Sequence, residues 1–435
     1  MSLWNETRKS LASHFESGAA WYLLASALPS AAAVGLGPLV LRKTGMEGYA
    51  LLGLATYFST LIAGYTDFST TLHLIGEFSK KSASRVRDLA NAFFLKLFLT
   101  ALAAFVLGAY SFWRPRNDEL YVLLAVFLIG MPLSSASFEW YFLARRRYRE
   151  VFLIRAVATG MQVCLVAAWL ASDFERLVSY QLLLLAAGVT GGAQALWMLG
   201  GDRFRRGLRA LKDASPRGVR SLALRLFPMS ASLLLTPYFL AYALPWYLMT
   251  QPDPRLQGSF SIAYRLITGA MTLMVPLVVY GISRNALPGH VVSFARCLKL
   301  SAGACGAFWV AGVPVIWLYF QISAMDLALI THCLRTYSVL LVGIFFLSLR
   351  IPYVSRWVYH GGYGRYFLAL LCACTPTLLL SWTAGADFPA AWVAWCALVP
   401  ELVTTVIFVA YDPAKKRLRP ASSGIEGTAP TDLII

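Results

Sequence analysis

The chain has 435 residues, of which 58% are hydrophobic and only 14% are charged, and its formal net charge is +17. Soluble globular chains average about 45–50% apolar and about 25% charged residues, so this composition excludes an ordinary soluble protein. The basic residues lie mainly in short connections between apolar segments, whereas a nucleic-acid binder needs a folded basic face, so we expect no nucleic-acid partner.

Apolar segments of about 20 residues recur along the chain, and each is long enough to cross a hydrocarbon core of roughly 30 Å as a helix. The segments are continuously apolar rather than alternating, which favours helices over a β-barrel. We therefore predict an all-α polytopic membrane protein with about twelve transmembrane helices. The predicted spans are residues 20–41, 49–72, 89–111, 120–142, 151–171, 177–199, 221–249, 259–282, 297–320, 326–349, 366–384 and 388–410.

Lysine and arginine concentrate in alternate connections. The segments 80–87, 145–149, 203–220 and 415–419 each hold four or more of them, whereas the connections on the opposite side hold at most two each. The positive-inside rule then predicts cytoplasmic N- and C-termini for a multi-pass protein of a bacterial inner (plasma) membrane.

The longest of these basic connections, residues 200–220, divides the predicted spans into two sets of six. We predict an N-terminal six-helix lobe (1–199), a C-terminal six-helix lobe (221–410) and a cytoplasmic tail (411–435). Each half opens with a proline-interrupted span, and the next span starts with glycine, at Gly48 and Gly258. Interrupted helices in matching positions of two halves are typical of a transporter site between repeats.

Features of an enzyme are absent from the sequence pattern. No predicted outer connection exceeds about ten residues, and no cluster of His, Asp and Glu marks a membrane surface. The seven cysteines lie in or beside apolar segments without the spacing of a zinc site. We expect no catalytic site, metal or cofactor.

Three stretches, in the second, fourth and eighth predicted spans, each carry a motif. The second span starts with glycine and ends in an aspartate-aromatic turn. The fourth combines a proline with an acidic-Trp stretch that enters a basic connection, and the eighth again starts with glycine. These stretches are residues 48–68, 132–146 and 258–276. In them the chain resembles the polysaccharide flippases of the O-antigen transporter (Wzx-like) type, in the multidrug/oligosaccharidyl-lipid/polysaccharide exporter superfamily. It departs at Leu143 and Ala144, where that family usually has glutamine and glycine.

The resemblance implies two pseudo-symmetric six-helix lobes around a central cavity. It also implies a flippase that moves an undecaprenyl-diphosphate-linked oligosaccharide from the cytoplasmic to the outer leaflet by alternating access, for O-antigen, capsule or exopolysaccharide biosynthesis. Membrane lipids, a polysaccharide polymerase and a chain-length regulator would be its partners. The alternatives are a multidrug or small-solute exporter of the same superfamily, which would favour an acidic cavity, and an integral-membrane polymerase or acyltransferase.

Charged residues inside the spans are candidate site residues, because a charge at the bilayer centre costs about 2.5–3.5 kcal/mol on insertion scales. Guanidinium groups bind diphosphates in a bidentate manner, which suits a polyanionic cargo. Structural ion pairs, and snorkelling near the cytoplasmic face, are the alternatives. The predicted cationic lining of the cavity comprises Arg335, Arg265, Arg155, Lys96 and Arg225.

Three acidic residues in or near the spans have separate expected roles. Glu401 lies deep in the last predicted span and is the candidate for ion coupling, because a buried carboxylate can exchange a proton during a conformational cycle. Asp67 and Glu139 lie at cytoplasmic helix ends, and we predict that each pairs with a lysine or arginine and latches the two lobes.

Overall fold

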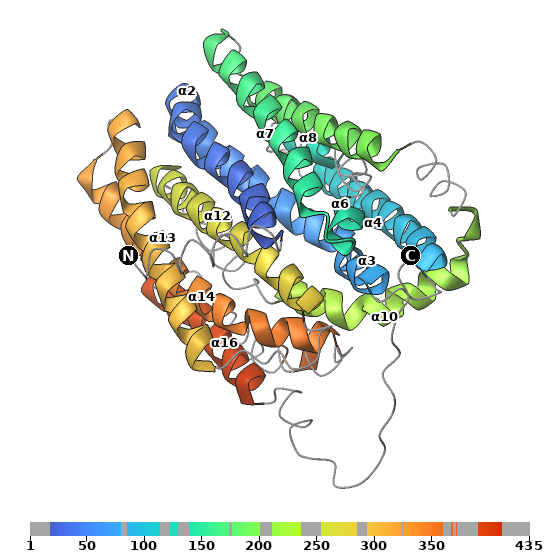
Figure 1. Ribbon diagram of the computed structural model, residues 1–435. Helices are drawn as coiled ribbons and strands as arrows, with labels where there is room; N and C mark the ends of the chain where they lie inside the picture. Colours follow the sequence, from blue (N-terminus) through green and yellow to red (C-terminus); the bar gives the residue numbers. More distant parts are fainter. Residues whose placement is uncertain are drawn as a thin grey trace, which may run out of the picture.

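The structure is a computed structural model of the chain, and every described element is a helix, a turn or a connection (Figure 1). Parts of the predicted spans 120–142 and 221–249, and most of 366–384, lie outside the described residues. The structure describes residues 18–79, 85–113, 122–128, 139–173, 176–200, 211–235, 254–284, 294–323, 326–359, 367–368, 371 and 390–410.

The first two predicted spans form one hairpin of two helices, labelled together as α2 (Ala19–Asp67). The helices meet at Gly45, whose φ of 68° and ψ of −179° interrupt the helical backbone. A positive φ is accessible to glycine because it has no Cβ. The chain turns back there, since Tyr22 packs in one cluster with Leu74 while the residues near Gly45 pack in another. We call the two ends of the bundle the Gly45 end and the Phe68 end.

The second predicted span, 49–72, breaks earlier than expected. Phe68 and Ser69 both adopt positive φ, at 45° and 57°, so α2 ends there and a new helix begins at Thr70. The fifth and sixth predicted spans coincide closely with α7 (Tyr148–Ala171) and α8 (Leu177–Leu199). The remaining helices of the N-terminal half are α3 (Thr70–Ser79), α4 (Arg85–Trp113), residues 122–128, α6 (Glu139–Ala144), α7 (Tyr148–Ala171) and α8 (Leu177–Leu199).

In the C-terminal half, α14 (Leu327–Tyr359) packs against α12 (Pro254–Arg284), α13 (Phe294–Ser323) and α16 (Ala390–Ala410), and α12 also lies against α2 of the other half (Figure 1). Helix α14 extends to Tyr359, ten residues beyond the predicted end of its span at residue 349. The elements of this half are α10 (Pro216–Leu235), α12 (Pro254–Arg284), α13 (Phe294–Ser323), α14 (Leu327–Tyr359) and α16 (Ala390–Ala410).

Helix α10 follows the connection between the halves and a short 3-10 turn, Leu211–Asp213. Its first turn is capped by Ser215, whose Oγ accepts a hydrogen bond of 3.0 Å from the Gly218 N–H, and Pro216 occupies the first helical position. The Ser215 N–H in turn donates to Oδ1 of Asn91 on α4, at 3.3 Å. This contact fixes the start of α10 against the N-terminal half.

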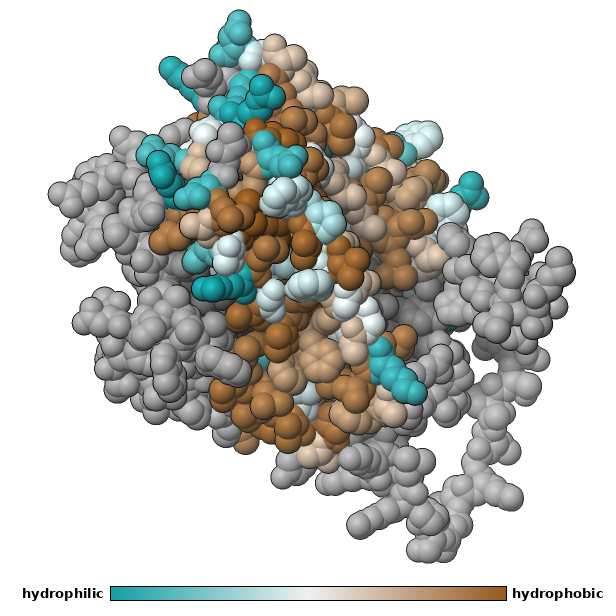
Figure 2. Space-filling view, turned by 90° about the vertical axis from the view of Figure 1, so that its left-hand side faces the viewer, coloured by the Kyte–Doolittle hydropathy of each residue, from teal (hydrophilic) through white to brown (hydrophobic). Residues whose placement is uncertain are grey.

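The surface of the bundle is apolar, as expected for contact with lipid. Phe98, Phe105 and Trp197 are 62%, 73% and 77% exposed, and Figure 2 shows a face on which hydrophobic side chains predominate. Within the described residues, six helices are long and apolar enough to cross a membrane, with the α2 hairpin counted once. The chain is therefore a multi-pass membrane protein.

Candidate functional site

Arg265 lies between the two halves, near the Gly45 end. It extends from α12, is half-buried, and places its guanidinium 4.7 Å from the ring centroid of Tyr49 on α2. The Tyr49 hydroxyl donates to the Tyr319 hydroxyl on α13 at 3.3 Å, and the Tyr319 hydroxyl donates to the Val34 carbonyl at 3.4 Å. Tyr49 and Tyr319 are fully buried. The predicted cation thus lies over an aromatic face rather than against a carboxylate.

Glycines allow the halves to approach closely around this arginine. A Cβ on Gly37 would overlap the Tyr319 hydroxyl, and a Cβ on Gly53 would lie 2.7 Å from the Ser261 Cβ. A Cβ on Gly258 would lie 2.7 Å from the Met46 sulfur. These contacts join α2 to α12 and α13, and we call them, together with the Tyr49–Tyr319 pair, the Gly45-end seam.

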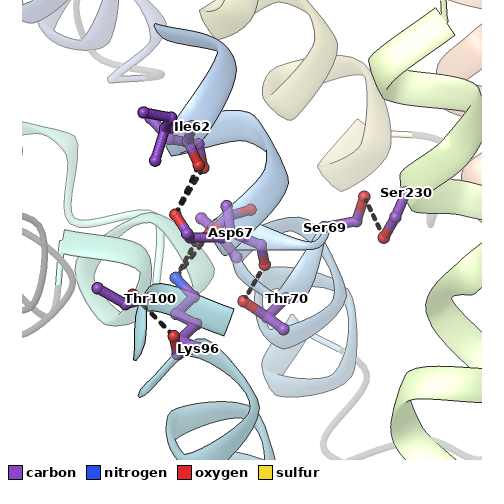
Figure 3. A network of polar contacts seen from close by, with 10 residues as sticks. Ile62, Asp67, Ser69, Thr70, Lys96, Thr100 and Ser230 are labelled. Carbon is purple, nitrogen blue, oxygen red and sulfur yellow. Dashed lines mark hydrogen bonds and ion pairs between the residues drawn. The ribbon is translucent and has the colours of Figure 1, made fainter. Parts of the chain in front are cut away.

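The Phe68 end carries a polar network in which Asp67 pairs with Lys96 (Figure 3). The Asp67 Oδ1 lies 2.6 Å from the Lys96 ammonium and accepts a 2.6 Å hydrogen bond from the Thr71 hydroxyl. Lys96 also donates to Thr71, at 3.0 Å. Asp67 therefore pairs with a lysine as predicted, but its partner lies on α4 in the same half, so this pair does not latch the two halves.

A different set of side chains joins the halves at this end. Arg225 on α10 lies 3.2 Å from Asp88 on α4 and 3.0 Å from the His73 ring on α3. The Ser230 hydroxyl of α10 donates to the Ser69 hydroxyl at 3.2 Å (Figure 3). Arg225, predicted to line a cavity, thus takes the cross-half role that the sequence assigned to Asp67 and Glu139.

Arg155 and Glu139, two further predicted residues, pair with each other. The Arg155 guanidinium lies 2.5 Å from Glu139, donates to the Ser26 hydroxyl at 2.8 Å, and lies 5.6 Å from the Tyr22 ring centroid. All four residues belong to the N-terminal half. Glu139 therefore also pairs with an arginine as predicted, without reaching across to the C-terminal half.

Glu401 on α16 forms an ion pair with Arg350 on α14, and the two side chains are only 2% and 1% exposed. Among the described residues, none forms a hydrogen bond with the Arg350 Nε. The sequence identified Glu401 but missed Arg350, because this arginine lies one residue beyond the predicted end of its span. The pair fastens α14 to α16 within the C-terminal half.

Arg335, another arginine of the predicted cavity lining, is exposed on α14, beside His332. His332 itself is 3.0 Å from the Ser259 hydroxyl of α12. Among the described residues, none lies within ion-pairing distance of Arg335 with an opposite charge. Arg335 and Arg265 are on neighbouring helices, but the structure does not bring them into contact.

The charge balance of the interior is cationic. Every buried or half-buried carboxylate that the structure describes has a cationic partner within 4 Å, whereas Arg265 has none of these carboxylates as a partner. In the same described part, no group of three or more His, Cys, Asp and Glu side chains could hold a metal ion. The paired carboxylates are Asp67, Asp88, Glu139, Glu150 and Glu401.

The sequence prediction missed Tyr49, Tyr319 and Asp88. Tyrosines are abundant in this chain, with 21 of them, so no residue-type signal singled out two. Tyr49 directly follows Gly48, where the sequence pattern predicts that a span starts. Asp88 lies in the first turn of α4 beside two basic residues, and its position resembled a solvated helix end.

No protein-family model matches the chain, and no curated protein matches it. Solved structures do match. A multidrug resistance MATE family transporter of the MOP superfamily in an outward-facing conformation shares 13% identity, with 93% of this chain and 96% of that chain covered and a TM-score of 0.67. An inward-facing MATE transporter of the same superfamily also shares 13% identity, covers 93% and 96%, and has a TM-score of 0.57.

A third match is a MOP superfamily transporter from Pyrococcus furiosus, for which reverse polarity of the binding pocket suggests a different function. It shares 13% identity, covers 92% of this chain and 95% of that chain, and has a TM-score of 0.66. These likenesses confirm the predicted fold class, a twelve-helix membrane bundle of two six-helix lobes. The boundaries chosen for the two lobes stay a prediction.

Proposed function

We propose that the chain is a membrane transporter of the multidrug/oligosaccharidyl-lipid/polysaccharide exporter superfamily that works by alternating access. Two observations support this. The fold is that of known transporters over nearly the whole chain. The halves also contact each other at both ends of the bundle, through the Gly45-end seam and through Arg225 with Asp88. Such contacts can break in turn while each half moves as a unit.

The cargo that the charges favour is anionic, and the observation that carries this choice is Arg265. It is half-buried between the halves, where it contacts the Tyr49 ring and the Tyr319 hydroxyl. Among the described residues it has no carboxylate partner, so its charge is available to an anionic ligand. A guanidinium binds phosphate through two parallel, charge-assisted hydrogen bonds. Arg335, exposed on the neighbouring α14, adds a second cation on the same half.

Within this class we propose an undecaprenyl-diphosphate-linked oligosaccharide, moved from the cytoplasmic to the outer leaflet of a bacterial inner membrane for surface polysaccharide biosynthesis. The resemblance of residues 48–68, 132–146 and 258–276 to O-antigen flippases supports this cargo. A polymerase and a chain-length regulator as partners, and cytoplasmic termini, belong to the same proposal.

The second candidate is an exporter of cationic drugs, and the likeness to multidrug resistance transporters favours it. Such an exporter needs an acidic site for its cargo. Among the described residues, each buried or half-buried carboxylate is already paired with a cation. A cationic drug would therefore have to displace an internal arginine or lysine, and this cost is the reason we rank it second.

The deciding experiment reconstitutes the purified protein in liposomes. A labelled undecaprenyl-diphosphate-linked oligosaccharide is placed in one leaflet and its appearance in the other is measured, alongside uptake of a cationic dye. We expect lipid movement and no dye transport. Arg265→Gln should lower lipid transport about tenfold or more, because a hydrogen-bonded charge contributes about 1.5–3 kcal/mol.

Two variants serve as controls. Arg265→Lys keeps the charge but not the bidentate geometry, so it should retain part of the activity. Arg42→Gln removes an exposed cation near the Gly45 end and should leave transport unchanged. Charge reversal at Arg335 should abolish transport if this arginine also binds cargo. Dye export without any lipid movement would replace our choice with the second candidate.

A further inference from the structure

The side chains of the Gly45-end seam come from both halves, and they would move apart in two groups when the halves separate. Tyr49 belongs to α2, whereas Tyr319 and Arg265 belong to α13 and α12. Separation at this end would carry the Tyr49 ring away from the guanidinium while Tyr319 stays beside it. Arg265 would then lose the Tyr49 ring and keep its charge and its hydrogen bond to the Tyr319 hydroxyl.

The hydroxyl groups of the seam are already used within it. Tyr49 donates to Tyr319, and Tyr319 donates to the Val34 carbonyl of α2. Arg265 donates a hydrogen bond to the Tyr319 hydroxyl of its own half. From the other half it meets the electron-rich face of Tyr49, 4.7 Å from ring centroid to guanidinium carbon. An aromatic face attracts a cation more weakly than a phosphate that accepts two charge-assisted hydrogen bonds.

We propose that the Tyr49 ring occupies the anion site of Arg265 in this closed state, and that the anionic headgroup of the cargo displaces the ring and thereby opens the seam. This inference rests on the proposed anionic cargo and adds how that cargo is coupled to the opening of one end. It assigns Tyr49 a positioning role, because the ring holds Arg265 in place while no cargo is bound.

The geometry explains why the displacement would open the seam rather than only rearrange one side chain. Tyr49 is one turn from Gly45 and one turn from Gly53, where α2 approaches α12 closely enough to exclude a Cβ. A fully buried ring in such a close contact cannot rotate away by itself. Its helix must move with it.

Reversible cross-linking tests the idea without a transport assay. In a background without the seven native cysteines, Ser30→Cys on α2 and Gly269→Cys on α12 place two thiols across the same α2–α12 contact, one turn of α12 from Arg265, where the Cβ positions are 3.7 Å apart. This spacing lies within the Cβ–Cβ range of about 3.5–4.5 Å that a disulfide needs, and we call these two positions the seam pair. The matched control is Ala158→Cys with Gly191→Cys, whose Cβ positions are 2.9 Å apart on α7 and α8 of one half.

The rate of disulfide formation is measured with farnesyl diphosphate as the anionic probe and with farnesol as its neutral counterpart. We expect the diphosphate to slow cross-linking across the seam at least threefold, farnesol to have no effect, and the control pair to be unaffected. Arg265→Gln should remove the diphosphate effect. Tyr49→Leu should slow cross-linking without any probe, whereas Tyr49→Phe, which keeps the ring, should do so less.

The proposal is overturned if farnesyl diphosphate leaves the seam pair unchanged, slows both pairs equally, or acts equally well on Arg265→Gln. The result is separable from that of the transport assay. A diphosphate effect on the seam in a protein that moves no lipid-linked oligosaccharide would contradict the cargo. Lipid transport with no diphosphate effect would contradict the displacement of Tyr49.

Discussion

Replacing one member of the Arg350–Glu401 pair should destabilise the protein strongly. The two side chains are 1% and 2% exposed, so removal of either leaves the other charge buried and uncompensated. Breaking a buried pair in this way costs about 3–5 kcal/mol in other proteins. We expect a loss of that size for Arg350→Met and for Glu401→Leu.

The double substitution should behave differently from either single one. Replacing both members of a buried pair by apolar residues removes both desolvation costs and is often neutral or stabilising. The variant with Arg350→Met and Glu401→Leu should therefore recover most of the stability. Its free energy of unfolding should lie within about 1–2 kcal/mol of the unsubstituted protein, since imperfect repacking costs about that much.

Unfolding can be measured in mixed micelles with increasing dodecyl sulfate, by the fluorescence of the 13 tryptophans. Arg335→Met is a suitable control, because this arginine lies exposed on the same helix and its loss should change stability by less than about 0.5 kcal/mol. A loss of less than about 1 kcal/mol for either single substitution would contradict the buried charge pair. So would a double variant whose loss of stability equals the sum of the two single losses.

The same variants examine the predicted role of Glu401 in ion coupling. A pair that only fastens α14 to α16 should leave the pH dependence of transport unchanged in the stable double variant. If Glu401 couples transport to protons, its removal in that variant should abolish the pH dependence. Transport measured in proteoliposomes with and without a pH gradient separates the two roles.

Two further predictions concern the Gly45 end and the orientation. Gly37→Ala should lower the free energy of unfolding by about 1–3 kcal/mol in the same measurement, because the new Cβ overlaps the buried Tyr319 hydroxyl. Gly35→Ala is the control, since a Cβ there meets nothing within 4 Å and should not destabilise the protein. Equal effects of the two substitutions would contradict the close contact at Gly37. Single cysteines in place of the exposed Arg149 and Asp173 report the orientation through a membrane-impermeant maleimide. Asp173→Cys should react in intact cells, and Arg149→Cys only after permeabilisation, because the predicted orientation places Arg149 in the cytoplasm. The reverse pattern would contradict that orientation.

The sequence by itself determined the fold class and most helix positions. The spans predicted at 151–171 and 177–199 agree with α7 and α8, because an apolar segment of about 20 residues must become a helix in lipid whatever surrounds it. Sequence also identified Arg265, Glu401 and Arg225 as unusual, since a charge within an apolar segment is conspicuous without any knowledge of its neighbours.

Only the tertiary structure decided which charge meets which partner. Arg350 and Glu401 are 51 residues apart in the chain, and Tyr49 and Tyr319 are 270 residues apart. Such contacts depend on how helices pack, and hydropathy carries no information about packing. This is why Asp67 and Glu139 were predicted to join the halves, whereas packing gave them partners in their own half. Tyr49 is one tyrosine among many, so only the position of Arg265 over its ring identifies it as a candidate site residue.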